Sequence, residues 1–341
     1  MEFFIGTYTS GGSQGIYRAH WRNEVLQITE CAKIENPSFL TAQKNTLYAA
    51  RETNNGSVAA FRVEPDALTP IGEQPILGDA PCHLCVTGER LYVSNYTSGS
   101  LTIIDLDADG AFASSPRVIQ HEGRSVHARQ RAPHVHQSQP TPDGRFLAVC
   151  DLGTDAVIFY PLDGDGLHTP GQRVQTPAGA GPRHAAYGGN ECWYVLCELS
   201  CELLVYTGYG NEAKLVFRFN ALRDTDPEST GAALQLSPDG KLLLASVRGA
   251  NTLVLWNVSP DGILSGDRWF DAHGDSPRDA VFTPDGRHVI CACERSDRVT
   301  VFALRDGELV FLHAAGVPMP TCISLAEPFI NERFMNAAGS I

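Results

Sequence analysis

The sequence contains no long uninterrupted run of hydrophobic residues and no excess of positive charge. Nowhere do about 18 apolar residues follow one another, as a membrane-spanning helix requires. The N-terminal MEFFIGTYTSGG lacks the basic segment and long apolar stretch of a secretion signal. With 39 acidic against 26 basic residues, the formal net charge of −13 argues against nucleic acid or a membrane as a partner. We therefore expect a cytoplasmic protein.

Several familiar catalytic and metal-binding motifs are also missing. There is no G-x-S-x-G, no Walker loop and no H-E-x-x-H, so nothing favours a serine hydrolase, a nucleotide site or a zinc protease. Ten cysteines are present, mostly within strand-like apolar runs and without a compact disulfide framework. Cys82 and Cys85 form a C-x-x-C pair with no second pair, so we expect buried free thiols.

Helical periodicity is nearly absent, and in its place the sequence shows a repeat. LYVSNYTSGSLTIIDL (91–106), LAVCDLGTDAVIFYPL (147–162) and LLASVRGANTLVLWNV (243–258) each read as strand, polar turn, strand. Six of the seven copies follow another short apolar strand, usually opened by proline. Three are joined to that strand by Pro-Asp-Gly, a tight-turn sequence, at 142–144, 238–240 and 284–286.

Seven units of about four short strands at this spacing predict an all-β, seven-bladed β-propeller. The N-terminal hairpin (3–21) has no upstream strand, while PTCISL (320–325) has no hairpin after it. Joining the two completes the seventh blade from both chain ends and removes two exposed sheet edges. With 43% hydrophobic residues and no boundary in the repeat, residues 1–341 are expected to form a single domain.

The turns between the two hairpin strands should all lie at one mouth of the central channel. At the strand end before the turn, the blades offer a chemically uneven set of polar residues, and loops on a rigid scaffold are where function concentrates. These residues are Thr7, Arg51 with Glu52, Asn95, Asp151, Glu198, Arg248 and Glu294.

The stretch RAPHVHQ (131–137) adds two histidines at the start of an inner strand. Because strand side chains alternate, His134 and His136 are expected to face the channel together. Arg183 and His184 occupy the corresponding position in the next blade. Taken singly, polar residues at blade ends are more often structural, and a Glu–Arg pair between blades can be an ordinary ion pair. The combination of imidazole, guanidinium and carboxylate around one concavity favours a site.

These stretches resemble the family of seven-bladed propeller lactonases, which includes 6-phosphogluconolactonases and a carboxymuconate-lactonizing enzyme. The resemblance spans essentially the whole chain. It includes FFIGTYTSGG, RAPHVHQ, GAGPRHAAY with CELS, LQLSPDGKLLLASVRGANTL and SPRDAVFTPDG, of which GPRH followed by ELS is the most specific part. Cys197 and Val247, beside the expected site, depart from the family pattern.

The resemblance implies a metal-free site without a cofactor. By position, His136 or its neighbour His134 matches the family's histidine, Arg183 and Arg248 its arginines and Glu198 its glutamate. We expect hydrolysis of a sugar lactone, most plausibly 6-phosphoglucono-δ-lactone to 6-phosphogluconate in the pentose phosphate pathway. His136 would act as base with Glu198, and the arginines would hold anions. Around this catalytic set, the expected substrate-binding residues are His134, His184, Asn95, Asp151, Arg51 and Glu294.

Three other interpretations stay open at the level of sequence. The same site could serve another carboxylated lactone, as a lactonase or a cycloisomerase. The chain could instead be a non-catalytic interaction scaffold, as many propellers are. A calcium-dependent lactonase would use Asn95, Asp151, Glu198 and Glu294, although neighbouring arginines would repel the cation. The expected partner is a small anionic lactone, and the expected assembly is a monomer or weak homodimer.

Overall fold

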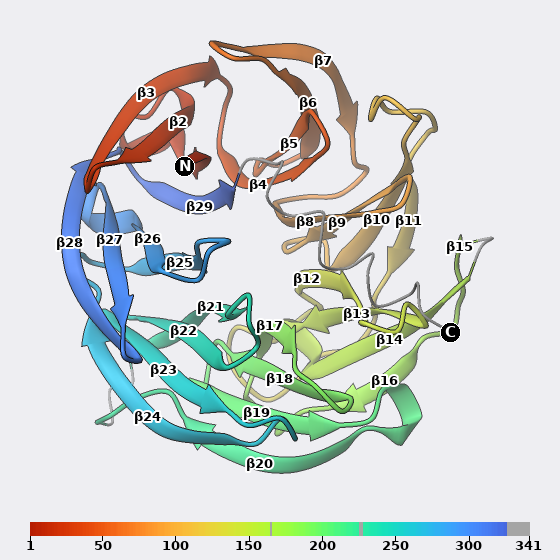
Figure 1. Ribbon diagram of the computed structural model, residues 1–341. Coiled ribbons are helices and arrows are strands. Elements are labelled where there is room, and N and C mark those ends of the chain that lie inside the picture. The colour runs from red at the N-terminus through yellow and green to blue at the C-terminus, as the bar shows by residue number, and fades with distance from the viewer. Residues whose placement is uncertain (164–165, 225–227, 326–341) are drawn as a thin grey trace, which may run out of the picture.

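The computed structural model describes residues 1–163, 166–224 and 228–325, and it folds as a seven-bladed β-propeller. Each blade is an antiparallel sheet, and Figure 1 shows the blades arranged in a ring around a common central axis. Four short 3-10 turns are the helical elements of the described chain. Within those residues, no helix is both long and apolar enough to cross a membrane. The predicted fold is therefore confirmed.

Every blade follows the same strand order from the channel outward. The strands nearest the channel are β4 (Pro37–Gln43), β8 (Pro81–Thr87), β12 (Val135–Pro140), β17 (Pro182–Tyr187), β21 (Thr230–Leu236), β25 (Pro277–Phe282) and β29 (Pro320–Leu325). The second strands are β1 (Glu2–Thr7), β5 (Thr46–Arg51), β9 (Arg90–Asn95), β13 (Phe146–Asp151), β18 (Cys192–Cys197), β22 (Leu242–Arg248) and β26 (His288–Cys293).

The outer half of each blade contains the third and fourth strands. The third strands are β2 (Gly15–Arg22), β6 (Ser57–Val63), β10 (Ser100–Asp105), β14 (Ala156–Asp163), β19 (Glu202–Thr207), β23 (Thr252–Val258) and β27 (Arg298–Arg305). The outermost strands are β3 (Val25–Lys33), β7 (Leu68–Pro75), β11 (Arg117–Gln120), β16 (Gln172–Gln175), β20 (Lys214–Asn220), β24 (Leu264–Asp271) and β28 (Glu308–Gly316). A short extra strand, β15 (Gly166–Leu167), pairs with the end of β14.

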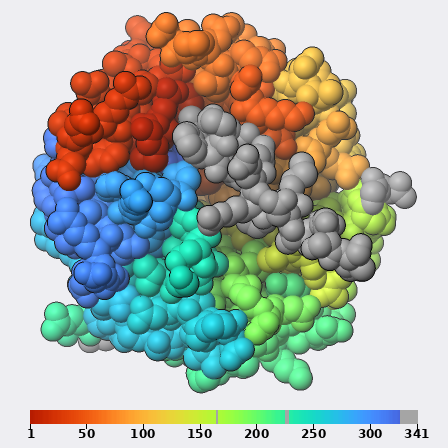
Figure 2. Space-filling view, viewed as in Figure 1, coloured from red at the N-terminus to blue at the C-terminus, as the bar shows by residue number. Residues whose placement is uncertain are grey.

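The ring closes as the sequence predicts, because β29 pairs antiparallel with β1. The first and last segments of the described chain thus share one sheet, and red and blue segments lie side by side in Figures 1 and 2. Gly6 of β1 also allows the next blade to approach closely, since a Cβ there would lie 2.4 Å from the carbonyl oxygen of Pro37. Apolar side chains of this junction, such as Phe3, Ile290 and Ile323, are buried in one cluster.

The core consists of such clusters between neighbouring blades. Phe159 of β14, for example, packs edge to face on Trp193 of β18 at 5.1 Å between ring centroids. The ten cysteines are free, and eight of them are buried, as expected from their positions in apolar strands. The Pro-Asp-Gly stretches form turns, and Gly144, Gly240 and Gly286 adopt φ of 70°, 73° and 68°, a conformation that glycine tolerates.

A buried polar relay fastens the chain after β11 to the next blade. His121 lies between Asp151 and Tyr160, with Nδ1 at 2.9 Å from Asp151 Oδ2 and Nε2 at 3.0 Å from the Tyr160 hydroxyl. The other oxygen of Asp151 accepts the backbone N–H groups of His134 and Gly153. Burial raises the pKa of Asp151, but the hydrogen bond and charge of His121 lower it more, so the net pKa lies below its ordinary value.

This relay predicts an acid-dependent contribution to stability. A carboxyl whose pKa is lower in the folded chain stabilises it above the unfolded pKa of about 4, and that contribution is lost as the pH falls through the folded value. Asp151→Asn should lower the free energy of unfolding at pH 7 by about 3 kcal/mol, measured by urea denaturation. The exposed Asp109→Asn should change it by less than about 0.5 kcal/mol. Equal stability of the Asp151 variant and the wild type would contradict this role.

Candidate active site

The inner strands share a backbone irregularity at their channel entrance. In each blade the hydrogen-bonding register between the inner strand and the second strand shifts near the start of the inner strand. One or two inner-strand residues there have no partner in the ladder. Such a bulge re-aims a side chain. The residues at the bulges are Ser38, Cys82, His136, Arg183, Ala232 with Ala233, Arg278 and Thr321.

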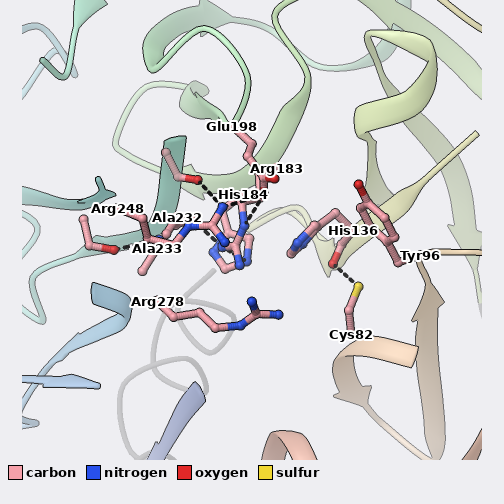
Figure 3. A network of polar contacts seen from close by, with 12 residues as sticks. Cys82, Tyr96, His136, Arg183, His184, Glu198, Ala232, Ala233, Arg248 and Arg278 are labelled. Atoms are coloured by element: carbon pink, nitrogen blue, oxygen red, sulfur yellow. Dashed lines mark hydrogen bonds and ion pairs between the residues drawn. The ribbon is translucent and has the colours of Figure 1, made fainter. Parts of the chain in front are cut away.

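Five of these bulged residues line one narrow cavity at the channel entrance, where the space between atoms, open solvent included, is about 270 Å³. The cavity is lined by Ser38, Phe39, Cys82, Arg183, His184, Arg278, Asp279 and Thr321. Figure 3 shows the side chains of His136, Arg183 and Arg278 pointing toward one another around this space. The bulges thus gather polar groups from blades that are distant in sequence.

A second ring of side chains comes from the residues that end the second strands. In each blade we take the second-strand residue that follows the ladder partner of the last inner-strand residue before the bulge. These residues are Tyr8, Glu52, Tyr96, Leu152, Glu198, Arg248 and Glu294. Four of the residues predicted for this rim lie one position earlier in their strands, in register with Cys197, Val247 and Cys293 of the other blades. They are Thr7, Arg51, Asn95 and Asp151. The rim residue predicted from the sequence was therefore one residue too early in three blades, at Thr7, Asn95 and Asp151, while in a fourth blade Arg51 was named together with the correctly aligned Glu52.

Because neighbouring strand residues point to opposite faces, this shift removes three expected substrate-binding residues from the site. Arg51 instead pairs with Glu73 and Glu35. Asn95 is buried and donates to Ser100 and Thr102 of the neighbouring strand.

Asp151 belongs to the His121 relay described above. The four residues considered as calcium ligands are therefore not brought together, and no group of three or more His, Cys, Asp or Glu side chains suited to a metal occurs among the described residues. Cys197 and Val247, which depart from the family pattern, are buried in apolar clusters and do not alter the polar surface of the channel.

Glu198 is the centre of the site. Its Oε2 lies 3.0 Å from Arg183 Nε and 3.0 Å from Arg248 Nη2, and its Oε1 accepts a hydrogen bond from Arg129 Nη2 at 2.6 Å. Arg183 also donates to the carbonyl of Ala232 and to His184 Nε2. The sequence analysis correctly placed Glu198, Arg183 and Arg248 together, from two neighbouring blades.

The charges of this cluster do not balance, since three guanidiniums share one carboxylate. Burial raises the pKa of Glu198, but Arg248, Arg183 and Arg129 outweigh it and lower the pKa to about 2. Burial lowers the pKa of Arg183 to about 10, and Arg248 contributes in the same direction. Both groups remain charged at neutral pH, and the cluster carries an excess of positive charge that an anion would satisfy.

His136 faces this cluster and has an unused nitrogen. The residue is 5% exposed, and its Nδ1 is buried without a hydrogen-bond partner. Burial lowers the pKa of His136 well below its ordinary value, and the charges of Arg183 and Arg278 lower it further. His184, at 5.4 Å between ring centroids, likewise has a pKa held well below its ordinary value, first by burial and then by Arg183. Both imidazoles are therefore neutral at pH 7.

His134 occupies a different place from the one expected. β12 begins at Val135, so His134 precedes the strand and the period-two argument for its orientation is wrong. Its ring stacks on Tyr96 at 4.4 Å between centroids, and its Nδ1 lies 2.8 Å from the Tyr96 carbonyl oxygen. Tyr96 in turn meets the edge of His136 at 5.9 Å, so His134 supports the site through Tyr96.

Arg278 and Arg129 are site residues that the sequence analysis missed. Arg278 follows Pro277 as Arg183 follows Pro182, so aligning the two inner strands could have found it. It donates to Glu294 and to the Tyr8 hydroxyl. Arg129 lies in a loop outside the repeat, and no sequence signal points to it. That loop is fixed by the buried Gln130, which donates to the Leu152 carbonyl and to Asp155.

Comparison with known proteins shows which protein family has this architecture. The family model described as a seven-bladed β-propeller lactonase matches residues 2–325. The chain belongs to this family and is a lactonase, an enzyme that hydrolyses lactones.

Individual relatives narrow the comparison. A 6-phosphogluconolactonase of Bacillus subtilis strain 168 is 32% identical over 340 residues, which cover 94% of this chain and 97% of that protein. The solved structure of a periplasmic gluconolactonase of Pseudomonas aeruginosa superposes with a TM-score of 0.87 at 30% identity, covering 95% of this chain and 98% of the other. A Lactobacillus plantarum protein of known structure reaches a TM-score of 0.89 at 28% identity, with 96% and 99% covered.

The shared carboxylate predicts a specific response to its removal. Glu198→Gln leaves the guanidiniums of Arg129, Arg183 and Arg248 facing one another without a counter-charge, and the free energy of unfolding should fall by about 4 kcal/mol. Adding inorganic phosphate should restore part of this loss, because the anion replaces the carboxylate.

Glu202→Gln is the matched control, since Glu202 pairs with Arg218 at an exposed position and should cost less than about 1 kcal/mol. Both variants are compared by urea denaturation with and without phosphate. Similar losses in the two variants, or no rescue by phosphate, would contradict the shared-charge interpretation.

Proposed function

We propose that this lactonase hydrolyses 6-phosphoglucono-δ-lactone to 6-phosphogluconate, the lactone-opening step of the pentose phosphate pathway. The observation that carries the proposal is the unpartnered Nδ1 of buried His136, which lies beside an arginine cluster with excess positive charge. A neutral imidazole can accept a proton from water, and guanidiniums stabilise the oxyanion that forms as water attacks the carbonyl.

The proposed reaction needs water and no further reactant. The water oxygen bonds to the carbonyl carbon while its proton passes to His136 Nδ1. Arg183 and Arg248 stabilise the resulting oxyanion. As the bond between that carbon and the ring oxygen breaks, the protonated His136 returns its proton to the ring oxygen, leaving a hydroxyl and a carboxylic acid. The ring oxygen is a poor leaving group as an alkoxide, so this protonation lowers the barrier.

Glu198 has a positioning role in this scheme, which revises the expectation of a shared His/Glu base. Its pKa of about 2 keeps it ionised, and its two oxygens are occupied by three guanidiniums. No hydrogen bond joins Glu198 to His136 within the described part of the chain. Glu198 holds Arg183 and Arg248 in place, and His136 alone transfers the proton.

The excess positive charge supports an anionic substrate. A phosphate accepts bidentate hydrogen bonds from guanidinium. Because a phosphorylated sugar does not cross membranes and stays inside the cell, the proposal places the protein in the cytoplasm. The Bacillus subtilis relative carries the name of this activity. The Pseudomonas aeruginosa neighbour is described as a periplasmic gluconolactonase, which makes unphosphorylated glucono-δ-lactone the second candidate substrate.

A direct assay tests the proposal. Purified protein should accelerate the decay of freshly prepared 6-phosphoglucono-δ-lactone above its spontaneous rate, followed by acid release. The kcat/KM for this lactone should exceed that for glucono-δ-lactone, because the phosphate adds an ion pair. Arg183→Ala should lower kcat several-hundred-fold, and His136→Gln by about 10²–10⁴-fold. His20→Gln, on outer strand β2, is the matched histidine control. Wild-type rates equal to the blank would refute the proposal.

The low pKa of His136 predicts an unusual pH profile. A base works when neutral, so kcat/KM should stay constant from pH 8 to below pH 6.5 and fall only in more acidic solution. Glucono-δ-lactone is the appropriate substrate because it has no titrating phosphate, and the spontaneous rate is subtracted at each pH. With the phosphorylated lactone, the bound dianion should raise the pKa of His136, so kcat should fall at a higher pH. A half-maximal kcat/KM near pH 6.5 for the neutral lactone would rule out His136 as the base.

A further inference from the structure

The side of the channel mouth opposite Glu198 carries a second polar cluster with the reverse charge balance. We infer that Glu52 and Glu294 in this cluster bind hydroxyl groups of the lactone ring, and thereby select a polyhydroxylated lactone over one that bears several carboxylates. This inference rests on the proposed function, and it names the part of the site that recognises the sugar.

Three adjacent blades build the cluster. The Tyr8 hydroxyl donates to Glu52 Oε2 at 2.8 Å and accepts from Arg278 Nη2 at 2.6 Å. Arg278 Nη1 donates to Glu294 Oε2 at 3.2 Å, and its guanidinium lies over the Tyr8 ring at 5.0 Å. Tyr8, Glu52 and Glu294 occupy in their blades the same register position as Glu198 in its own.

One guanidinium here faces two carboxylates, so the cluster favours groups that donate hydrogen bonds. Within the described residues, Oε1 of Glu52 and Oε1 of Glu294 accept no hydrogen bond, and these side chains remain 18% and 14% exposed. A carboxylate oxygen free at a channel mouth binds a hydroxyl through a short charge-assisted hydrogen bond. The same oxygen repels a carboxylate of a ligand, because two negative charges close together in a partly buried site raise the free energy of the complex.

An independent feature of the same mouth indicates that a ligand enters it. His136 is buried, its Nδ1 lacks a partner, and in Figure 3 its ring points into the space between Arg183 and Arg278. Buried polar nitrogens are usually hydrogen-bonded, so this nitrogen is available to a group that enters the mouth. That group would lie between the positive cluster of Glu198 and the negative cluster of Glu52 and Glu294.

The two clusters match the two edges of a sugar δ-lactone. One edge of the six-membered ring contains the carbonyl, the ring oxygen and the ring carbon to which the phosphorylated CH₂ group is attached. The other edge carries the hydroxyl groups. With the ester edge toward Arg183 and Arg248, the hydroxyl edge faces Glu52 and Glu294. A lactone with several carboxylates would place negative charge against those two glutamates, which argues against a carboxylated muconolactone as the natural substrate.

The test compares lactones that share a ring and differ in hydroxyls. Glu52→Gln and Glu294→Gln are assayed with glucono-δ-lactone and with δ-valerolactone, which has no hydroxyl groups. Tyr8 and Arg278 donate to these side chains, so they retain the glutamine oxygen and turn the NH₂ group toward the channel. We expect kcat/KM for glucono-δ-lactone to fall roughly tenfold in each variant. The value for δ-valerolactone should stay within about twofold, and that for the dicarboxylated isocitric lactone should rise or stay unchanged.

Glu73→Gln is the matched control, because Glu73 also pairs with an arginine but lies on an outer strand. Retained hydrolysis of δ-valerolactone shows that the variants fold. Equal losses with both lactones would mean that the cluster is only structural and would overturn the inference.

Binding of gluconate, measured by calorimetry, separates this inference from the proposed function. If wild-type protein opens no lactone yet binds gluconate in a manner that both variants weaken, the proposed function fails and the inference stands. If instead the protein hydrolyses 6-phosphoglucono-δ-lactone and neither variant changes that rate, the proposed function stands and the inference fails.

Discussion

One backbone constraint places the functional side chains of this channel: the register shift that each inner strand makes near its start. Without it, Arg183 and His136 would continue the ordinary alternation of their strands. With it, residues from separate blades meet around a single cavity. The same shift occurs where β29 pairs with β1, so closing the ring also completes the site. Fold stability and chemistry therefore depend on the same ladder, and a change that slipped one strand would damage both.

The clustered positive charges of the site destabilise the folded protein. Glu198 offsets this effect in part, and a bound anion would offset the rest. The guanidiniums of buried Arg183, partly buried Arg248 and exposed Arg129 repel one another around Glu198, and the single carboxylate reduces that repulsion only in part. The residual positive charge also keeps the pKa of His136 low, since Arg183 and Arg278 disfavour its protonated form. An imidazole held neutral in this way is ready to accept a proton at any physiological pH.

The sequence was sufficient for the fold and for the central residues, and its errors have a single physical origin. Strand–turn–strand repeats report directly on blades, and the GPRH and ELS stretches placed Arg183 and Glu198 correctly. Side-chain direction, however, depends on register to one residue, and no pattern in the sequence marks a bulge. That is why Arg51, Asn95 and Asp151 were assigned to the channel, and why His134 was placed in a strand that begins one residue later. Arg129 comes from an irregular loop, where periodicity carries no information at all.

The opposed clusters at the channel mouth explain how a site rich in arginine can avoid indiscriminate anion binding. A channel lined only by guanidiniums would hold any small polyanion, and specificity requires an unfavourable interaction with the wrong ligand as well as a favourable one with the right ligand. Glu52 and Glu294 supply that unfavourable interaction, while Arg278 between them limits their mutual repulsion. The field across the cavity then runs from the Arg183 side to the Glu52 side. In the proposed binding mode, a ligand with one charged edge and one hydroxylated edge would lie in that field in a single orientation, with its carbonyl toward His136.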